Sequence, residues 1–452
     1  MPLYEFKEGS SSKFWEISLS GNSFTTRWGK IGTKGQEKTQ RFSNAVEARS
    51  EYDKLVSEKT KKGYVLAQGL AEPAEEQADV SSSLARRNPE LEAAIEKAPD
   101  DVAAYRAYGE WLTQQGDPRG ELIALQCAEH LASGEEAKAL KQQASAWVRK
   151  YKSFLLGELA GQEKNEVSVE WRFGFIRSAR LAKGDYDSEF DVAGALTRLL
   201  ALPSARFLRE LTIGMADFDG DNSYGDVIAS LARASCPTLE RLFLGDFEYP
   251  DETEISWSSL GDISSLYRVL PGLRSLKLRG GGLGLGEVVL PELREFTVET
   301  GGLPLEAVQS LAKAKWPKLE RLEVWFGSEE YGAGGGVEDL QPLLDGQGVP
   351  ALKHLGLRNA EFANALCTAL PQAKVLTRLE SLDLSMGILT DEGASALVEH
   401  AAAFKHLKRL DVTESLLSAE GVKQVAKLGE GVAAGKQRDD EDSEYRYVAV
   451  GE

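Results

Sequence analysis

The chain is poor in cysteine, in histidine and in long apolar runs. Only 3 cysteines and 4 histidines occur in 452 residues, and Cys127, Cys236 and Cys367 are far apart with no CxxC pair. Such spacing indicates neither a disulfide framework nor a zinc site. No run approaches the ~18 apolar residues of a membrane span, and the opening MPLYEFKEGS lacks a signal-peptide core. We expect a cytoplasmic protein without a metal.

Enzyme signatures are missing as well. The sequence contains no GxxxxGK[ST] phosphate loop, no HExxH and no GxSxG. The glycine run at 280–286 does not follow GxGxxG, and we interpret it as a loop. We therefore expect no enzymatic activity and no cofactor. An unrecognised site among the acidic loops is the enzymatic alternative.

The negative charge is concentrated outside the N-terminal region. The chain carries a net charge of −18, but residues 1–70 hold 12 Lys or Arg against 8 Asp or Glu, which leaves −22 for the remainder. An acidic body repels polyanions, whereas a basic module can still bind one. If the protein binds nucleic acid, the N-terminal region binds it.

Residues 1–67 alternate apolar and polar residues, with Gly21-Asn22 between two such stretches, which predicts a β-hairpin. A helix with Ser43 as its N-cap is expected to follow. The region resembles the WGR domain, found beside the catalytic region of poly(ADP-ribose) polymerases and in many bacterial proteins, at FWEI (14–17), RWGKIG (27–32) and KTKKGY (59–64). The family usually has arginine where Lys30 stands, so the bidentate phosphate contact is lost.

A nucleic-acid site is the functional hypothesis for this module. Trp28 offers a stacking plane and nearby basic residues offer phosphate contacts, so the candidate residues are Arg27, Trp28, Lys30, Lys34, Lys38 and Arg41. Lys59–Lys62 either extends the patch or stabilises a helix C-terminus. The alternative is that Trp28 belongs to the core and the lysines are merely solvated. DNA is the favoured partner, with RNA and protein as alternatives.

Residues 68–86 are rich in Ala, Glu and Ser and are expected to be a linker. Apolar residues at helical spacing then predict a small helical domain over 87–160. Its first part resembles a repeat-companion domain common in myxobacterial and planctomycete proteins, at YGEWL (108–112) and GDPRGELI (116–123). That resemblance implies a position before leucine-rich repeats and no particular chemistry.

An internal repeat dominates residues 165–428. The template L-x-x-L-x-L occurs eight times, from Leu208/Leu211/Ile213 to Leu407/Leu410/Val412. Spacings scattered about 20 to 29 residues are typical of leucine-rich repeats, and stacking buries leucines that a single unit would expose. We predict an α/β fold, a leucine-rich-repeat solenoid or horseshoe of the ribonuclease-inhibitor type, preceded by the small β-rich module and the helical domain. The segment VSVEWRFGFIRSARL is expected to cap the solenoid as a hairpin.

Residues between the repeat leucines are expected to line the concave surface of the solenoid. The candidate protein-binding residues are Arg241, Phe243, Lys277, Arg279, Arg321, Glu323, Trp325, His354, Arg358, Asp383, Ser385, Arg409 and Asp411. Trp171, Trp257, Trp316 and Trp325 are candidate anchors, because aromatic residues dominate binding hot spots. Trp325 is the preferred one of these four.

These features together predict a non-enzymatic adaptor, in which the repeats bind a protein partner and the first module binds nucleic acid. The alternative is a scaffold that binds only proteins. Residues 429–452 form an acidic tail with a β-prone end, YRYVAV (445–450). Whether this end docks on the chain's own sheet edge or on another chain stays open.

Overall fold

The computed structural model describes residues 3–8, 11–42, 45–66, 87–218, 222–439 and 445–451. The expected linker and the expected N-cap Ser43 lie outside these residues. The chain divides into two compact units. The first comprises Met1–Gln162, Glu170–Arg177 and Ala201–Phe207, and the second comprises Glu163–Val169, Ser178–Leu200 and Leu208–Glu452.

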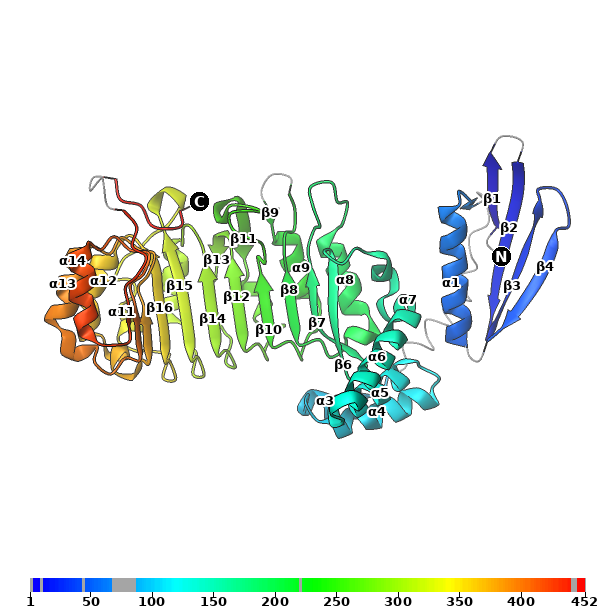
Figure 1. The fold of residues 1–452 in the computed structure, drawn as a ribbon, viewed down its shortest axis with the longest axis horizontal. Helices are drawn as coiled ribbons and strands as arrows, with labels where there is room; N and C mark the ends of the chain where they lie inside the picture. Colours follow the sequence, from blue (N-terminus) through cyan, green and yellow to red (C-terminus); the bar gives the residue numbers. More distant parts are fainter. Residues whose placement is uncertain are drawn as a thin grey trace. The chain divides into compact units, whose positions relative to one another are not determined.

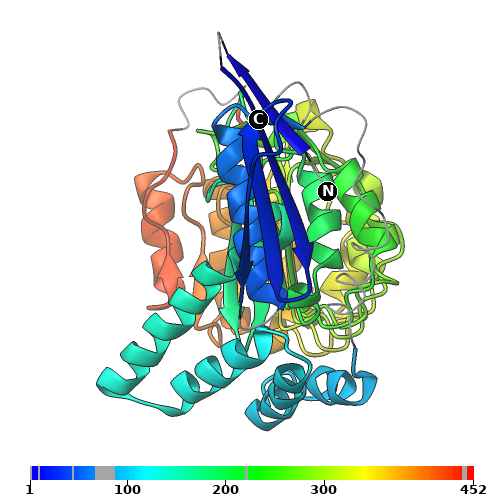
Figure 2. The same cartoon turned by 90° about the vertical axis from the view of Figure 1, so that its right-hand side faces the viewer.

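The N-terminal module is a five-stranded sheet covered on one face by a single helix (Figure 2). Its strands, in the order β4-β3-β2-β1-β5, are β1 (Leu3–Glu8), β2 (Ser11–Ser20), β3 (Ser23–Lys30), β4 (Gln36–Arg41) and β5 (Val65–Leu66), and its helix is α1 (Ala45–Lys61). The predicted hairpin is confirmed, since Ser20 pairs with Ser23 and Gly21 supplies a φ of 54°. Trp15, Ile17 and Tyr52 pack in the core.

Helices fill residues 89–156, in the region where the sequence predicts them. They are α3 (Pro89–Lys97), α4 (Val102–Gln114), α5 (Arg119–Leu131), α6 (Gly134–Lys150) and α7 (Lys152–Leu156). Side chains of Asn88 and Asp101 accept hydrogen bonds at the N-termini of α3 and α4, which satisfies N–H groups that would otherwise have no partner. Tyr108 and Leu112 on α4 are buried, as their helical spacing suggests.

An eleven-stranded sheet organises the rest of the chain (Figure 1). Its strands, in the order β19-β18-β17-β16-β15-β14-β12-β10-β8-β7-β6, are β6 (Val167–Arg172), β7 (Phe175–Leu181), β8 (Glu210–Ile213), β10 (Arg241–Leu244), β12 (Ser275–Arg279), β14 (Glu295–Glu299), β15 (Arg321–Gly327), β16 (His354–Ala360), β17 (Ser381–Asp383), β18 (Arg409–Asp411) and β19 (Val432–Ala433). From β7 to β19 neighbouring strands are parallel.

The repeat leucines account for this order. The second apolar residue of each of the eight templates lies on a strand, and these residues pair in register, as in Leu211, Leu242 and Leu276. Alternate residues of a strand point to opposite faces, so every strand contributes its leucines to the same buried face.

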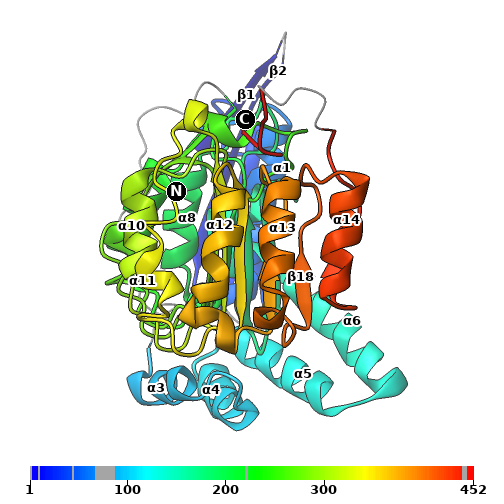
Figure 3. The same cartoon turned by 90° about the vertical axis from the view of Figure 1, so that its left-hand side faces the viewer.

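Helices and turns return the chain from one strand to the next. The helices are α8 (Val192–Ala201), α9 (Gly225–Arg233), α10 (Leu305–Lys313), α11 (Gln341–Leu344), α12 (Ala363–Ala369), α13 (Asp391–Glu399) and α14 (Ala419–Val425). Figure 3 shows α12, α13 and α14 side by side. Full helices at the last repeats agree with the length of their return segments.

The interpretation of 280–286 as a loop is wrong. Gly281–Gly284 forms β13, which pairs with β11 (Ser258–Asp262), and β11 pairs in turn with β9 (Asn222–Ser223). A glycine-rich backbone can hydrogen-bond to a neighbouring strand without any alternation of apolar side chains, so β13 has no side-chain pattern in the sequence. The loops after β8, β10 and β12 therefore carry a small parallel sheet of their own.

Candidate nucleic-acid and protein interfaces

The six predicted nucleic-acid residues lie on different sides of the N-terminal sheet. Trp28 pairs with Trp15, which is buried in the core beneath α1, and Lys30 pairs with the exposed Lys13. Paired residues of antiparallel strands point to the same face, so Trp28 and Lys30 lie on the face that α1 packs on. Lys38 pairs with Thr26 and has the same orientation. By the same alternation Arg27 and Arg41 point to the opposite face, and Lys34 lies in the turn between β3 and β4.

Arg27 is engaged within the domain. Its Nε donates to a Glu16 carboxylate oxygen at 2.5 Å, and its Nη1 donates to the Lys34 carbonyl at 3.3 Å. The guanidinium also lies 5.1 Å from the centre of the Phe14 ring. Hydrogen bonding to Glu16 raises the pKa of Arg27. We therefore assign Arg27 a role in holding the β3–β4 turn.

Gly29 permits the close approach of this turn. A Cβ on Gly29 would lie 2.8 Å from Gly35 Cα, and a Cβ on Gly35 would lie 2.6 Å from the Trp28 carbonyl. Gly35 also has a φ of 66°, which disfavours other residues. The tight turn places the ring of Trp28, which is 36% exposed, at the end of the sheet.

A basic cluster gathers on the face that carries Trp28. The Lys59 ammonium, from the last turn of α1, lies over the rings of Trp15 and Tyr64. Burial lowers the pKa of Lys59, and the charges of Lys62 and Lys13 lower it further. Lys13 on β2 and Lys62, just after α1, therefore both lie close enough to Lys59 to disfavour its charge. We call Lys13, Trp28, Lys30, Lys59 and Lys62 the basic face.

Sequence reasoning missed Lys13 in this set. It lies fifteen positions from Trp28, outside the run of basic residues between 27 and 41. The available signal was the hairpin register, which pairs Lys13 with Lys30 once the turn is placed at 21–22.

The predicted concave-surface residues occupy aligned rows on one face of the large sheet. The first row runs Glu210, Arg241, Ser275, Glu295, Arg321, His354, Ser381 and Arg409, and the second runs Thr212, Phe243, Lys277, Thr297, Glu323, Gly356, Asp383 and Asp411. We call this the outward face, because it alternates with the buried leucines.

Arg358 is the centre of one polar group on the outward face. Its Nη1 donates to a Glu323 oxygen at 2.6 Å, its Nε donates to Ser385 Oγ at 3.0 Å, and Asp383 is 3.5 Å away. The guanidinium lies 5.1 Å from the centre of the Trp325 ring, whose Nε1 donates to the same Glu323 oxygen. These contacts hold the half-exposed Trp325 ring in a fixed orientation.

A second group lies around Phe243. Lys277 Nζ is 4.8 Å from the centre of its ring, and Arg279 lies 5.9 Å from it. Both cations pair with Glu299, at 2.8 and 2.6 Å. Cations over an aromatic ring and a shared carboxylate form a preorganised, mixed surface of the kind used in recognition.

Several predicted residues are less available than expected. Asp411 is 6% exposed and accepts hydrogen bonds from Thr413, and Ser385 is 1% exposed. Among the candidate anchors, Trp316 is fully buried against Phe296. Trp325 is half-buried on the outward face and Trp171 is half-buried within the first unit, whereas Trp257 is 65% exposed.

His354, at the start of β16 in the first row, is half-buried. Its Nδ1 lies 2.8 Å from Ser381 Oγ. Burial lowers the pKa of His354, and the neighbouring charge of Arg321 lowers it further. The imidazole is thus biased towards its neutral form.

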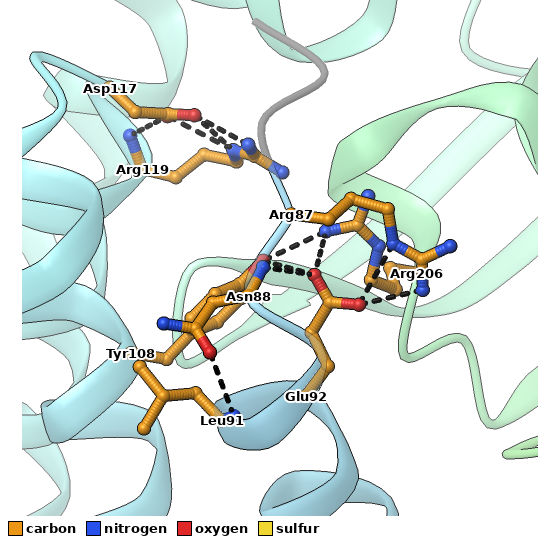
Figure 4. Close-up of polar contacts among 8 residues, drawn as sticks. All are labelled: Arg87, Asn88, Leu91, Glu92, Tyr108, Asp117, Arg119 and Arg206. Carbon is orange, nitrogen blue, oxygen red and sulfur yellow. Dashed lines mark hydrogen bonds and ion pairs between the residues drawn. The ribbon is translucent and has the colours of Figure 1, made fainter.

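The helical region contains a buried charged cluster that the sequence did not reveal (Figure 4). Glu92, on the inner side of α3, accepts hydrogen bonds from Arg87, Arg206 and Tyr108 at 2.6, 2.7 and 2.9 Å. Burial alone would raise the pKa of Glu92, but the bonds from Arg87 and Tyr108 and the charge of Arg206 lower it overall. Burial raises the pKa of Tyr108 to about 12. The cluster joins α3, α4 and the segment around Arg206.

Asp117 and Arg119 form a second buried pair in the same region (Figure 4). The Asp117 carboxylate accepts from the backbone N–H of Arg119 at 2.9 Å and from its guanidinium. It thereby begins α5, and the guanidinium lies 5.8 Å from the centre of the Phe175 ring. Both clusters serve the packing of the helical region, because their carboxylates form ion pairs with arginines of the same cluster.

Within the part of the chain that the structure describes, no three His, Cys, Asp or Glu residues converge as metal ligands would. Over those same residues, no helix combines the length and the apolar character that crossing a bilayer requires.

Comparison with known proteins identifies the N-terminal module. Residues 3–69 match the model of the WGR domain family, so the chain carries a WGR domain. Two Escherichia coli proteins are similar over limited stretches. YehF is 36% identical over 107 residues, which are 24% of this chain and 38% of YehF, and the uncharacterized YfeS is 37% identical over 59 residues, which are 13% and 24%. The chain thus spans well under half the length of these relatives.

Solved structures show that the fold is not unique to this chain. A Bacteroides fragilis protein matches over 100% of this chain and 99% of its own, with a TM-score of 0.51 and 24% identity. An internalin from Listeria monocytogenes aligns over 59% of this chain and 69% of its own, with a TM-score of 0.30 and 16% identity. The similarity to the Bacteroides fragilis protein therefore covers the whole length of both chains.

Proposed function

We propose that this protein is a non-enzymatic adaptor, in which the basic face of the WGR domain binds nucleic acid and the outward face of a leucine-rich-repeat solenoid binds a protein. DNA is the proposed nucleic acid, and the cytoplasm is the proposed location. One observation carries the nucleic-acid half: Lys13 on β2, Lys30 on β3 and Lys59 on α1 share one side of the sheet with Trp28, whose ring is 36% exposed.

The physical argument begins with repulsion. Burial and the charges of Lys62 and Lys13 disfavour the protonated form of Lys59 in the unbound protein, and Glu58 offsets part of this effect. Phosphates would neutralise these charges and release counterions, and a base or sugar could pack on Trp28. Arg27 and Arg41 take no part in this proposal, because they point away from the basic face.

The protein-binding half rests on the outward face. Trp325 and Phe243 are aromatic groups held in place by paired cations and carboxylates, as hot-spot residues commonly are. The first row is mixed in charge, since Arg241, Arg321 and Arg409 alternate with Glu210 and Glu295, and Arg241 and Arg409 pair with Glu295 and Asp411. An acidic or mixed protein surface is the partner that suits this arrangement.

Fluorescence anisotropy with the full chain tests the nucleic-acid half. Labelled single-stranded, blunt duplex and nicked DNA, and RNA, are titrated over a salt series. We expect binding that weakens steeply with salt and that falls at least tenfold in Trp28→Ala and in Lys30→Ala. Arg41→Ala is the matched control on the opposite face and should bind within twofold of the wild type.

The second candidate is a scaffold that binds only proteins. The engagement of Arg27 with Glu16 and the presence of lysine at position 30 favour it, since both weaken bidentate phosphate recognition. Flat titrations with every nucleic acid, at low salt, would establish this alternative and reject the nucleic-acid half.

A further inference from the structure

The C-terminal segment Tyr445–Gly451 docks on the second unit of its own chain. Figure 1 draws it in red, near the C-terminal ends of the parallel strands. The side chains of Val448 and Val450 are only 6% and 5% exposed. The segment adopts no strand and does not extend the sheet edge, which β19 occupies.

Hydrogen bonds to the backbone of Ala449 and Val450 hold the docked segment. Ala449 N donates to the Met386 carbonyl at 2.8 Å. Val450 N donates to Asn359 Oδ1 at 3.0 Å, and Asn359 Nδ2 donates to the Val450 carbonyl. One side-chain amide thus satisfies both backbone groups of a single residue.

Asn359 has no exposed surface, and its side-chain amide exchanges two hydrogen bonds with the backbone of Val450. A buried amide without partners is costly. If the segment leaves, the site is therefore favoured to take up another backbone.

Arg438 forms a clasp at the start of the docked segment. Its Nη1 donates to the Tyr447 carbonyl at 2.6 Å, its Nη2 to the Gly387 carbonyl at 2.8 Å and its Nε to the Glu414 carbonyl at 2.7 Å. The loops after β17 and β18 are thereby linked to the segment.

The segment packs on an apolar cluster. Val450 belongs to a cluster with Met215, Phe247, Ile255 and Met386, which we call the groove. Phe247 and Tyr249 also line an adjacent open cavity of about 660 Å³, whose other lining residues are charged: Arg180, Asp246, Glu248, Asp251, Glu252 and Arg279. The groove therefore borders a charged cavity.

We propose that this groove is a peptide-binding site and that Tyr445–Gly451 is its built-in occupant, which a partner displaces with an extended segment of the same chemistry. That segment carries small apolar residues at alternate positions, as Val448 and Val450 do, followed by glycine. Glycine is favoured at this position because a Cβ on Gly451 would lie 3.1 Å from the Tyr331 ring, and Gly301 leaves room for the Gly451 carbonyl. This inference rests on the protein-binding half of the proposed function and names its partner's chemistry and its regulation.

A labelled peptide, YRYVAVGE, tests the exchange on the full chain. Val448→Asp with Val450→Asp releases the built-in occupant, and this double variant should bind the peptide at least tenfold more tightly than the wild type. The peptide YRYDADGE is the control and should bind neither protein. A folded double variant that does not bind YRYVAVGE would overturn the proposal.

Hydrogen exchange of the wild type provides a test that needs no substitution. We expect the amides of Ala449 and Val450 to exchange at least tenfold faster than those of Leu355 and Leu382 in the sheet, because the segment opens without global unfolding. Equal rates at all four amides would make the segment a fixed part of the fold and reject the proposal. Neither experiment involves nucleic acid or the first-row arginines, so their failure leaves the nucleic-acid half of the proposed function and those arginines untouched.

Discussion

The ammonium nitrogen of Lys59 lies 5.5 Å from the centre of the Trp15 ring and 5.0 Å from that of Tyr64. Cation–π attraction favours this placement, whereas burial and the charges of Lys62 and Lys13 oppose it and lower the pKa of Lys59. The folded domain thus maintains a cation in surroundings that disfavour its charge. Such perturbed groups are typical of functional sites.

Lys59→Gln is expected to weaken nucleic-acid binding without lowering stability. Loss of one phosphate contact should reduce, by about 1, the steepness with which the logarithm of the binding constant falls with the logarithm of the salt concentration. The folded pKa lies below the unfolded value, so the unfolded chain binds more protons between the two, and wild-type stability rises with pH through that window towards 10.5. The substitution should remove that rise, measured by thermal unfolding over pH alongside anisotropy. Lys54→Gln, on the same helix, is the control; an equal loss of binding there would contradict the assignment.

Glu92→Ala is expected to destabilise the helical region strongly. It removes a buried carboxylate and leaves Arg206 and Tyr108 without their partner, at a cost of about 3–5 kcal/mol. Because the pKa of Glu92 is lowered, its contribution is present above the unfolded value of 4.5 and is lost as pH falls through the folded value. Urea unfolding at several pH values measures both effects. Glu90→Ala is the control, because Glu90 is exposed and lies two residues before Glu92 on the same helix, and it should change stability by less than about 0.5 kcal/mol.

Arg358→Ala should raise the pKa of the Asp383 carboxyl. Burial already raises that pKa, and Arg358 opposes the increase from 3.5 Å. A raised acid pKa means that the folded state binds more protons than the unfolded state, so this group's contribution to stability falls as pH rises from 3.8 through the folded pKa. Carbon-13 NMR titration of the carboxyl measures the change. Arg321→Ala, on the first row, should leave the titration of Asp383 in place; no shift in Arg358→Ala would refute the assignment.

Arg321→Ala should move the pKa of His354 up towards 6.5. Burial and the charge of Arg321 both lower it, and only the second is removed. Between the folded pKa and 6.5 the unfolded chain binds more protons, so wild-type stability declines as pH falls through this window, and the variant should decline less. Imidazole proton NMR follows the titration. Arg241→Ala, in the same row but four strands away from His354, should have no effect.

Much of the architecture could be predicted because it is periodic. The eight leucine templates place strands β8, β10, β12, β14, β15, β16, β17 and β18, since a stacked strand buries the same positions in each repeat. The glycine strand β13 could not be found in this way, because its pairing depends on the backbone of β11. The hairpin at Gly21 followed from turn chemistry alone.

The candidate sites were less predictable because they depend on faces and partners. Proximity in sequence grouped Arg27 with Trp28, whereas strand alternation places them on opposite sides of the sheet. Lys13 and Lys59 join Trp28 only through pairing and helix packing. Asp411 has the position of an outward residue, yet it is buried and its carboxylate accepts hydrogen bonds from Thr413.

The sequence by itself determined the order of the strands, the register of the repeats and the presence of a WGR domain, since each follows from short-range patterns of side chains. Only the tertiary structure decided which charges remain available for binding. Arg27, Glu92 and Arg358 are each neutralised by residues remote in sequence. It also decided that the C-terminal segment lies against Asn359, ninety-one residues earlier, because a long-range hydrogen bond leaves no periodic signal in the chain.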